Sequence, residues 1–101
     1  MARRRLGTST LAILRALADG HRYGFDMMDA TDLPGGTVYP ALAKLEKDKL
    51  VSSRWEDPTV AQEEKRPPRR YYKLSSAGER RLRTELSWLA GVAGTTVRTG
   101  S

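Results

Sequence analysis

Apolar residues recur at helical spacing near the start of the chain. Leu11 and Leu14, within residues 8–18, lie three residues apart, as on one face of a helix. Thr8 or Ser9 is available as its N-cap, because their side-chain oxygens accept hydrogen bonds from first-turn amides. The pattern therefore predicts a first helix over residues 8–18.

A second, shorter helix fits residues 23–31, where Tyr23, Met27 and Ala30 share one face. The sequence "DLPGG" then follows, and its proline and two glycines are typical of a turn. Two helices joined through such a short glycine-containing turn are the arrangement of a helix-turn-helix.

The third helix is predicted over residues 37–47, "TVYPALAKLEK", and it has two unlike faces. One face is apolar, because Val38, Leu42 and Leu45 stand at i, i+4 and i+7. The opposite face is formed by a proline and two lysines: Pro40, Lys44 and Lys47.

Thr37 is a credible N-cap for this helix and places Pro40 in its first turn. The amide groups of a first turn have no helical partner, so a proline there loses no hydrogen bond. On this interpretation Pro40 marks the start of the helix. The basic face of the helix then points away from the body of the protein.

After Leu50 the apolar period changes from helical to two. The segments "LVSSRWE" and "RRYYKLS" read as strands, and the polar, proline-containing loop "DPTVAQEEKRPP" separates them. The pattern predicts a hairpin with a long, mobile tip. Trp55, at the end of the first strand, is expected to pack against the strand opposite.

A last helix opens at "SSAGE". Ser76 with Glu79 fits a capping box, and Ser75 is the alternative N-cap. An apolar stripe then repeats at i, i+4, i+7 and i+11: Leu82, Leu86, Leu89 and Ala93. A stripe of this length on a terminal helix needs a covering surface. Residues 97–101 are expected to fray.

Composition narrows the functional classes. The formal net charge of +6 favours a polyanionic partner, either nucleic acid or an anionic membrane surface. The chain has no cysteine and one histidine, His21, which lies in a turn, so no nucleophile–base pair, metal site or cofactor site can be assembled. No apolar run approaches the length of a membrane span, and no signal peptide is expected. We therefore expect a cytoplasmic protein that is not an enzyme.

The order helix, helix, helix, hairpin, helix predicts a winged helix-turn-helix, an α+β fold that is mostly helical. We expect a DNA-binding domain over residues 1–75, with the wing at about 50–74, and a dimerisation helix over 76–96. In such a fold the third helix enters the major groove and the hairpin lies over the flanking backbone. The predicted contacts are Thr37, Tyr39, Pro40, Lys44, Lys47, Arg69 and Arg70.

The segments "GTVYPALAKLE" and "RRYYKLSSAG" resemble the PadR family of bacterial winged-helix transcriptional regulators, and "LGTSTLAILRALADGHRYGFDMM" extends the likeness to roughly residues 6–80. The short C-terminal part is similar to the compact subgroup. The resemblance implies a homodimer that represses transcription at palindromic operators in double-stranded DNA. It also places Thr37, Tyr39, Pro40 and Lys44 on the helix that faces DNA.

We expect a two-fold dimer in which the last helix packs against the last and first helices of the partner. The first helix would contribute Leu11 and Leu14, and the last helix its leucine stripe. The alternative is that the stripe covers only its own domain. Trp88 is either an interface anchor or a contact for a small aromatic effector of the kind that some relatives bind.

Two other functions compete with a sequence-specific regulator. One is a winged-helix module for protein–protein contact, and the other is a nonspecific nucleic-acid binder. The operator, the regulated gene, the direction of regulation and the role of the basic residues 2–5 are not encoded in any pattern of this chain.

Overall fold

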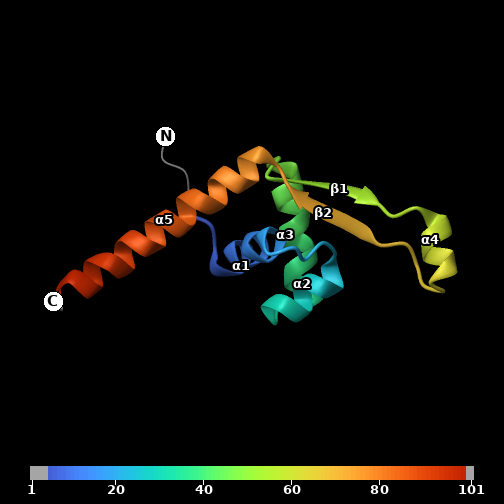
Figure 1. The fold of residues 1–101 in the computed structure, drawn as a ribbon, viewed down its shortest axis with the longest axis horizontal. Helices are drawn as coiled ribbons and strands as arrows, with labels where there is room; N and C mark the ends of the chain where they lie inside the picture. Colours follow the sequence, from blue (N-terminus) through green and yellow to red (C-terminus); the bar gives the residue numbers. More distant parts are fainter. Residues whose placement is uncertain (1–4, 100–101) are drawn as a thin grey trace.

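The computed structural model describes the backbone of residues 5–99 and the side chains of residues 5–91. Seven elements follow one another along the chain (Figure 1): α1 (Thr8–Ala18), α2 (Gly24–Thr31), α3 (Gly35–Lys47), β1 (Val51–Trp55), α4 (Pro58–Glu63), β2 (Arg70–Leu74) and α5 (Ser76–Thr99). Helices α1, α2 and α3 pack together, the two strands extend to one side of them, and α5 extends to the other.

The core lies where the three helices meet. Its largest fully buried side chains come from all three: Ile13, Leu14, Met27, Val38, Leu42 and Leu45. The apolar stripe predicted for the third helix is thus confirmed, with each of its members at most 2% exposed. Burying such a side chain stabilises the fold by about 1.5–3 kcal/mol before entropy is counted. These contacts hold α3 in one rotational setting.

The two strands form an antiparallel pair in which Val51 faces Leu74 and Trp55 faces Arg70. The segment before α2 adds to this hairpin, because the amide of Tyr72 donates to the carbonyl of Arg22 (2.7 Å) and Tyr23 forms an isolated bridge with Tyr71. The predicted winged helix-turn-helix is therefore the observed fold, and the wing is joined to the helical body through backbone hydrogen bonds.

The N-terminal ends of α1 and α3 differ from the prediction. Helix α1 is capped by Gly7 without a side-chain hydrogen bond, so neither Thr8 nor Ser9 is its N-cap. Helix α3 begins two residues earlier than predicted, after Pro34, because both glycines join its first turn. Pro40 is consequently the sixth residue of α3, in the interior of the helix.

The loop between the strands, predicted to be a long, mobile tip, includes a short helix. It contains α4, whose N-cap Asp57 accepts a hydrogen bond from the amide of Thr59 (2.8 Å) and whose first residue is Pro58. Proline is favoured at the first position of a helix because it lacks the amide that would be left unpaired there. The tip of the wing is therefore a folded unit.

Helix α5 begins at Ser76, so Ser75 and not Ser76 is its N-cap. The Ser75 hydroxyl accepts from the amide of Gly78 (3.0 Å) and donates to the carbonyl of Lys49 (2.7 Å), which ties the start of α5 to the turn between α3 and β1. The helix runs to Thr99, and its far half extends away from the body (Figure 1). Residues 100 and 101 of the expected frayed tail, and all side chains from Val92 onward, lie outside the described residues.

Candidate nucleic-acid interface

The outer face of α3 has the orientation that the sequence predicted. Pro40, Ala43, Lys44 and Lys47 are all exposed, while the opposite face of the helix is buried in the core. Both lysines lie in the last turn of α3. The helix therefore presents a proline, a small residue and two positive charges to solvent on one surface.

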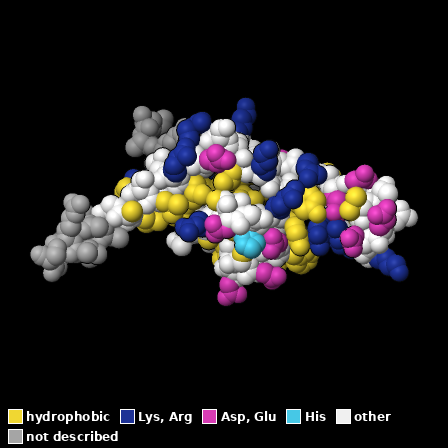
Figure 2. Space-filling model, in the orientation of Figure 1, with side chains coloured by type: hydrophobic (Ala, Val, Ile, Leu, Met, Phe, Trp, Pro, Cys, Tyr) yellow, Lys and Arg dark blue, Asp and Glu magenta, His cyan; other side chains and the backbone are white. Residues whose placement is uncertain are grey.

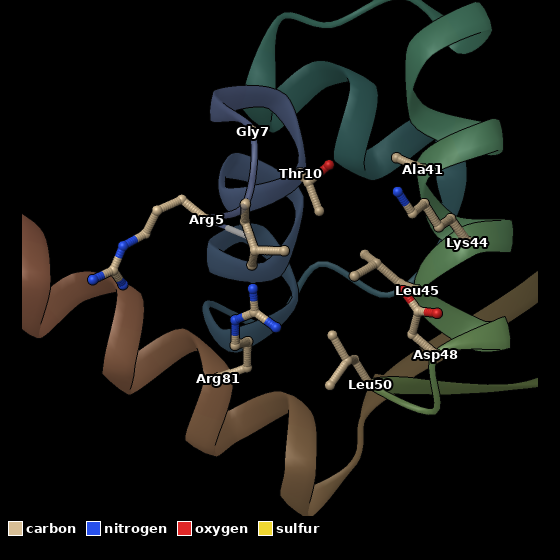
Figure 3. Close-up of a pocket in the computed structure, with 10 residues that line it drawn as sticks. Arg5, Gly7, Thr10, Ala41, Lys44, Leu45, Asp48, Leu50 and Arg81 are labelled. Atoms are coloured by element: carbon tan, nitrogen blue, oxygen red, sulfur yellow. The ribbon is translucent and has the colours of Figure 1, made fainter. Parts of the chain in front are cut away.

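The two lysines have different surroundings. Lys44 borders a cavity of about 590 Å³ between α1, α3 and α5, and in Figure 3 its ammonium group lies near Ala41 and Thr10. Arg81 also points into this cavity, whereas the guanidinium of Arg5 points away from it (Figure 3). Lys47 does not line the cavity. Both lysines are exposed, and Lys44 alone borders the cavity.

Tyr39 and Thr37, both predicted contacts, lie at the edges of the outer face. Tyr39 is 44% exposed, and its ring packs so closely against Gly24 that a Cβ at that position would overlap the ring. Thr37 is half-buried. Tyr39 is therefore held at the junction of α2, α3 and the wing, and its ring edge remains accessible.

Arg70, predicted to bind DNA, is bound within the protein. Its guanidinium donates to the Ser53 hydroxyl (2.8 Å) and to the Glu46 carboxylate (3.2 Å), and Ser53 itself donates to Glu46 (2.6 Å). Glu46 belongs to α3, Ser53 to β1 and Arg70 to β2. This group, which we call the wing-base bridge, joins α3 to both strands. Sequence reasoning missed it because its members lie up to 24 residues apart.

Arg69 is also engaged, since its guanidinium lies over the ring of Tyr23 at 4.1 Å from the centroid. Its backbone amide donates to the carboxylate of Glu56 (3.2 Å). Arg69 is half-buried, and its guanidinium forms no ion pair with any of the described residues. The positive charge of Arg70 is compensated by the Glu46 carboxylate, whereas that of Arg69 is not. Arg69 is therefore the wing arginine better placed to attract an external anion.

A buried carboxylate organises the wing tip. Glu56 is 6% exposed and accepts two hydrogen bonds from Arg66 (2.6 and 2.9 Å) and one from the hydroxyl of Tyr71 (3.0 Å). The Arg66 guanidinium, with help from the Arg69 amide and Tyr71, lowers the pKa of Glu56 to about 2 although burial opposes the shift. Glu56 is therefore ionised throughout the physiological range and holds the two limbs of the tip together.

Charge is unevenly distributed over the surface. Figure 2 shows Lys and Arg side chains over α5 and the base of the wing, and Asp and Glu side chains around α4 at the tip. Asp57, Glu63 and Glu64 are exposed there. A polyanion is therefore attracted to the base of the wing and repelled by its tip.

A second buried carboxylate, also missed from the sequence, lies on α5. Glu85 is 3% exposed and pairs with Arg81 (3.1 Å) and Arg5 (3.6 Å). Burial raises the pKa of Glu85, but Arg81, the backbone amide of Leu6 and Arg5 together outweigh burial, so the pKa lies below its ordinary value. Arg5 also stacks over the ring of Trp88 at 4.4 Å. The segment before α1 is thus fixed to α5.

The leucine stripe of α5 divides between two environments. Leu82 is 6% exposed and belongs to the core, Leu86 is half-buried, and Leu89 is 42% exposed. Leu82, like Leu14 in α1, is covered by its own chain, so the prediction that these two form a dimer surface is corrected. Leu11 is half-buried, and Ala93 lies outside the described side chains.

Trp55 and Trp88 are both largely accessible. Trp55 is 63% exposed and lies beside Arg70 of the opposite strand, whose guanidinium is 5.4 Å from the ring centroid. Trp88 is 44% exposed beneath Arg5.

Within the described residues, no group of three or more His, Asp or Glu side chains is arranged to hold a metal ion. No helix in that part of the chain has the length and hydropathy needed to cross a bilayer.

In this structure, α2 and a short turn precede a helix with an exposed basic face, and a hairpin follows it. This arrangement is that of a winged-helix DNA-binding protein. Solved structures of that class match the fold. A PadR-like transcription factor from Bacteroides fragilis is 30% identical, with 91% of this chain and 88% of that one covered at a TM-score of 0.71. A PadR family transcription regulator from Clostridium difficile is 20% identical, with 94% and 100% covered at a TM-score of 0.79.

A further neighbour is BpsR of Bordetella bronchiseptica, whose DNA binding is regulated by 6-hydroxynicotinic acid. It is 18% identical, with 95% of this chain and 68% of that one covered at a TM-score of 0.73. The model of the transcriptional regulator PadR-like family matches residues 13–84. The chain therefore belongs to the PadR-like family and is a DNA-binding transcription regulator. No curated protein matches its sequence.

Proposed function

We propose that this protein is a homodimeric repressor in the bacterial cytoplasm that binds a palindromic operator with the outer face of α3 in the major groove. The observation that carries the proposal is the exposure of Lys44 and Lys47 on a helix whose other side is locked into the core. Lysine side chains on such a face donate to phosphates and to guanine acceptors. Thr37, Tyr39 and Pro40 complete the contact surface.

The wing contributes in two ways. Arg69 offers a positive charge beside the outer face of α3, whereas Arg70 acts mainly through the wing-base bridge, which sets the angle of the wing. The acidic tip around α4 keeps the end of the wing away from DNA. The wing therefore contacts the duplex at its base.

The proposed dimer rests on the projecting part of α5. This helix has 24 residues, so it is about 36 Å long. Its first turns pack on the body, but Trp88 and Leu89 are more than 40% exposed and the helix continues beyond them. An isolated helical segment of this kind is marginal in water. A second copy, packing across α5 and the half-buried Leu11 of α1, supplies the missing cover.

Two substitutions test the DNA-binding face. We expect Lys44→Ala with Lys47→Ala to remove the preference for the operator and to leave the dimer intact. The residual DNA binding should have a slope of log K against log salt that is smaller in magnitude by about 3.6, because the dimer loses four positive charges. Arg15→Ala, which removes an exposed charge from α1, is the matched control and should bind as the unchanged protein does. Unaltered DNA affinity in the double variant would assign the chain to protein–protein contact. An equal loss on every sequence would indicate a nonspecific binder.

The symmetry of the complex is tested by selecting bound duplexes from a random pool. A two-fold dimer predicts a palindromic consensus with half-sites about one helical turn apart.

The oligomeric state is tested by light scattering, which should give the mass of a dimer for the unchanged protein. The Leu89→Asp variant should be a folded monomer. Transcription of a reporter should fall when the selected sequence overlaps its promoter, and a rise would show an activator.

Trp88 is our proposed contact for a small aromatic effector at the dimer interface. The observation in its favour is the Arg5 guanidinium over its ring, which supplies a positive charge beside an aromatic plate. The neighbour BpsR responds to an aromatic acid. Titration of a Trp55→Phe variant with a panel of aromatic acids should change Trp88 fluorescence, and a flat response across the panel would remove the effector from the proposal.

A further inference from the structure

Three exposed aromatic side chains converge on one groove. Phe25 is 70% exposed, Trp55 63% and Tyr39 44%, and they come from the start of α2, the end of β1 and the middle of α3. All three line a groove of about 500 Å³ between the two helices and the wing. Soluble proteins seldom leave such aromatic surface open to water without a partner for it.

The walls of the groove are held in place before any partner arrives. Tyr39 rests on Gly24, and Trp55 stacks with Arg70, which belongs to the wing-base bridge. Pro67 and Pro68 line the wing side and follow the arginine that clasps Glu56. Because Tyr39 and the hydrogen-bonded arginines behind Trp55 and Pro67 are already held in place, a partner binds with a smaller ordering cost.

The charge of the groove indicates what kind of partner fits. None of the described residues that line it is acidic, and three are arginines. Arg66 and Arg70 are paired with carboxylates behind the groove, whereas Arg69 stacks on Tyr23 at the rim and keeps its charge available. Aromatic walls with a positive rim suit a molecule with apolar rings and regularly placed negative charges.

The position of the groove selects among such molecules. Its two sides are α3, proposed to enter the major groove, and the wing, proposed to lie over the neighbouring backbone. Between two adjacent grooves of a duplex runs one sugar–phosphate strand. That strand has apolar deoxyribose faces and one negative charge per nucleotide, so it matches the lining in shape and in charge.

We propose that this groove holds one sugar–phosphate strand of the operator, with deoxyribose rings against Phe25, Trp55 and Tyr39 and a phosphate at Arg69. The proposal rests on the proposed function, because it requires α3 to face DNA. The aromatic contacts are independent of base sequence, so they add affinity and orientation but no specificity. They also release no counterions, which separates them from lysine and arginine contacts in experiments.

The test compares the salt dependence of DNA binding in single variants. Phe25→Ala and Trp55→Ala should each weaken binding about tenfold on the operator and on unrelated duplexes alike, with the slope of log K against log salt unchanged. Arg69→Ala should reduce the magnitude of that slope by about 1.8, because each dimer loses two phosphate contacts. Val60→Ala, which trims an exposed apolar side chain on α4 outside the groove, is the matched control and should leave binding unchanged.

Fluorescence gives a second measurement on the intact groove. In a Trp88→Phe background, Trp55 is the one remaining tryptophan of the chain, and its emission should change and saturate with one duplex per dimer. Wild-type affinity in both aromatic variants, with Lys44→Ala and Lys47→Ala still losing DNA, would overturn the groove proposal alone. Wild-type affinity in the lysine variants as well would overturn the proposed function. Thermal melts matching wild type would show that the aromatic variants fold.

Discussion

Replacing Glu46 by alanine removes the carboxylate at the centre of the wing-base bridge. The substitution deletes the hydrogen bond from Ser53 (2.6 Å) and the ion pair with Arg70 (3.2 Å). It leaves the core face of α3 untouched, because Glu46 lies between the buried stripe and the outer face. The variant therefore loosens the wing and preserves the helical body.

The expected loss of stability follows from the exposure of the two charged partners. Their side chains are 40% and 36% exposed, so the ion pair contributes less than about 1 kcal/mol. The hydrogen bond between Ser53 and the charged carboxylate adds about 1 kcal/mol. The total of about 1.5 kcal/mol corresponds to a fall of about 6–12 °C in the unfolding midpoint for a domain of this size.

The effect on DNA binding distinguishes a positioning role from simple electrostatics. Removing a negative charge beside the proposed DNA-binding face should by itself strengthen binding. If the bridge positions the wing, Glu46→Ala should instead weaken binding about fivefold, because the wing must then be ordered on the DNA. Glu46→Gln, whose amide oxygen still accepts from Ser53 and Arg70, should restore most of the affinity.

Fluorescence anisotropy of a labelled operator measures this difference directly. Asp48→Ala is the matched control, since it removes an exposed carboxylate from the end of the same helix and should bind DNA equally well or more tightly. Tighter binding by Glu46→Ala, equal to that of Asp48→Ala, would refute the positioning role of the bridge.

Three further substitutions test the fold itself. The pKa of Glu56 is lowered from 4.5 to about 2, so its contribution to the free energy of unfolding is complete above about pH 5 and is lost as the pH falls towards 2. Urea titrations at several pH values should show this loss of stability in the wild type and a smaller loss in Glu56→Gln. Equal losses in the two proteins would contradict the role assigned to Glu56. Gly78→Ala should cost about 3 kcal/mol, because a Cβ there overlaps the carbonyl of Leu50, and an unchanged melting midpoint would contradict this packing. Pro40→Ala should raise the free energy of unfolding by about 1–2 kcal/mol in urea titrations, because it restores an amide partner for the carbonyl of Gly36. A loss of stability in this variant would contradict that reasoning.

Much of the fold was predictable because its signals are local. The stripe of Val38, Leu42 and Leu45 predicts both the helix and its buried side, and the change to period two after Leu50 predicts the wing. The signal for α4 was also present, since Asp57 followed by Pro58 is a strong helix start. The run that follows is short and polar, however, so periodicity alone favours a loop over these residues.

The functional details depend on contacts between distant segments. The lysine face of α3 is a property of one helix and could be predicted. The pairing of Arg70 with Glu46, and the burial of Glu85 beneath Arg5, require the wing and α5 to be placed against the body first. The early start of α3 has a similar origin, because Gly35 lies beside Tyr39 and Met28 of α2, and a turn assignment from composition cannot include that contact.

The orientation of α3 on DNA is the central claim, and one cleavage experiment tests it most directly. Because the chain has no cysteine, Ala43→Cys provides a single attachment point for an iron–EDTA cleavage reagent on the exposed face of α3. On the selected operator, we predict two clusters of strand cuts centred on major grooves about one helical turn apart, one from each protomer. Cuts spread evenly along the duplex, or no cuts above the level of free reagent, would contradict the claim that this face of α3 reads DNA.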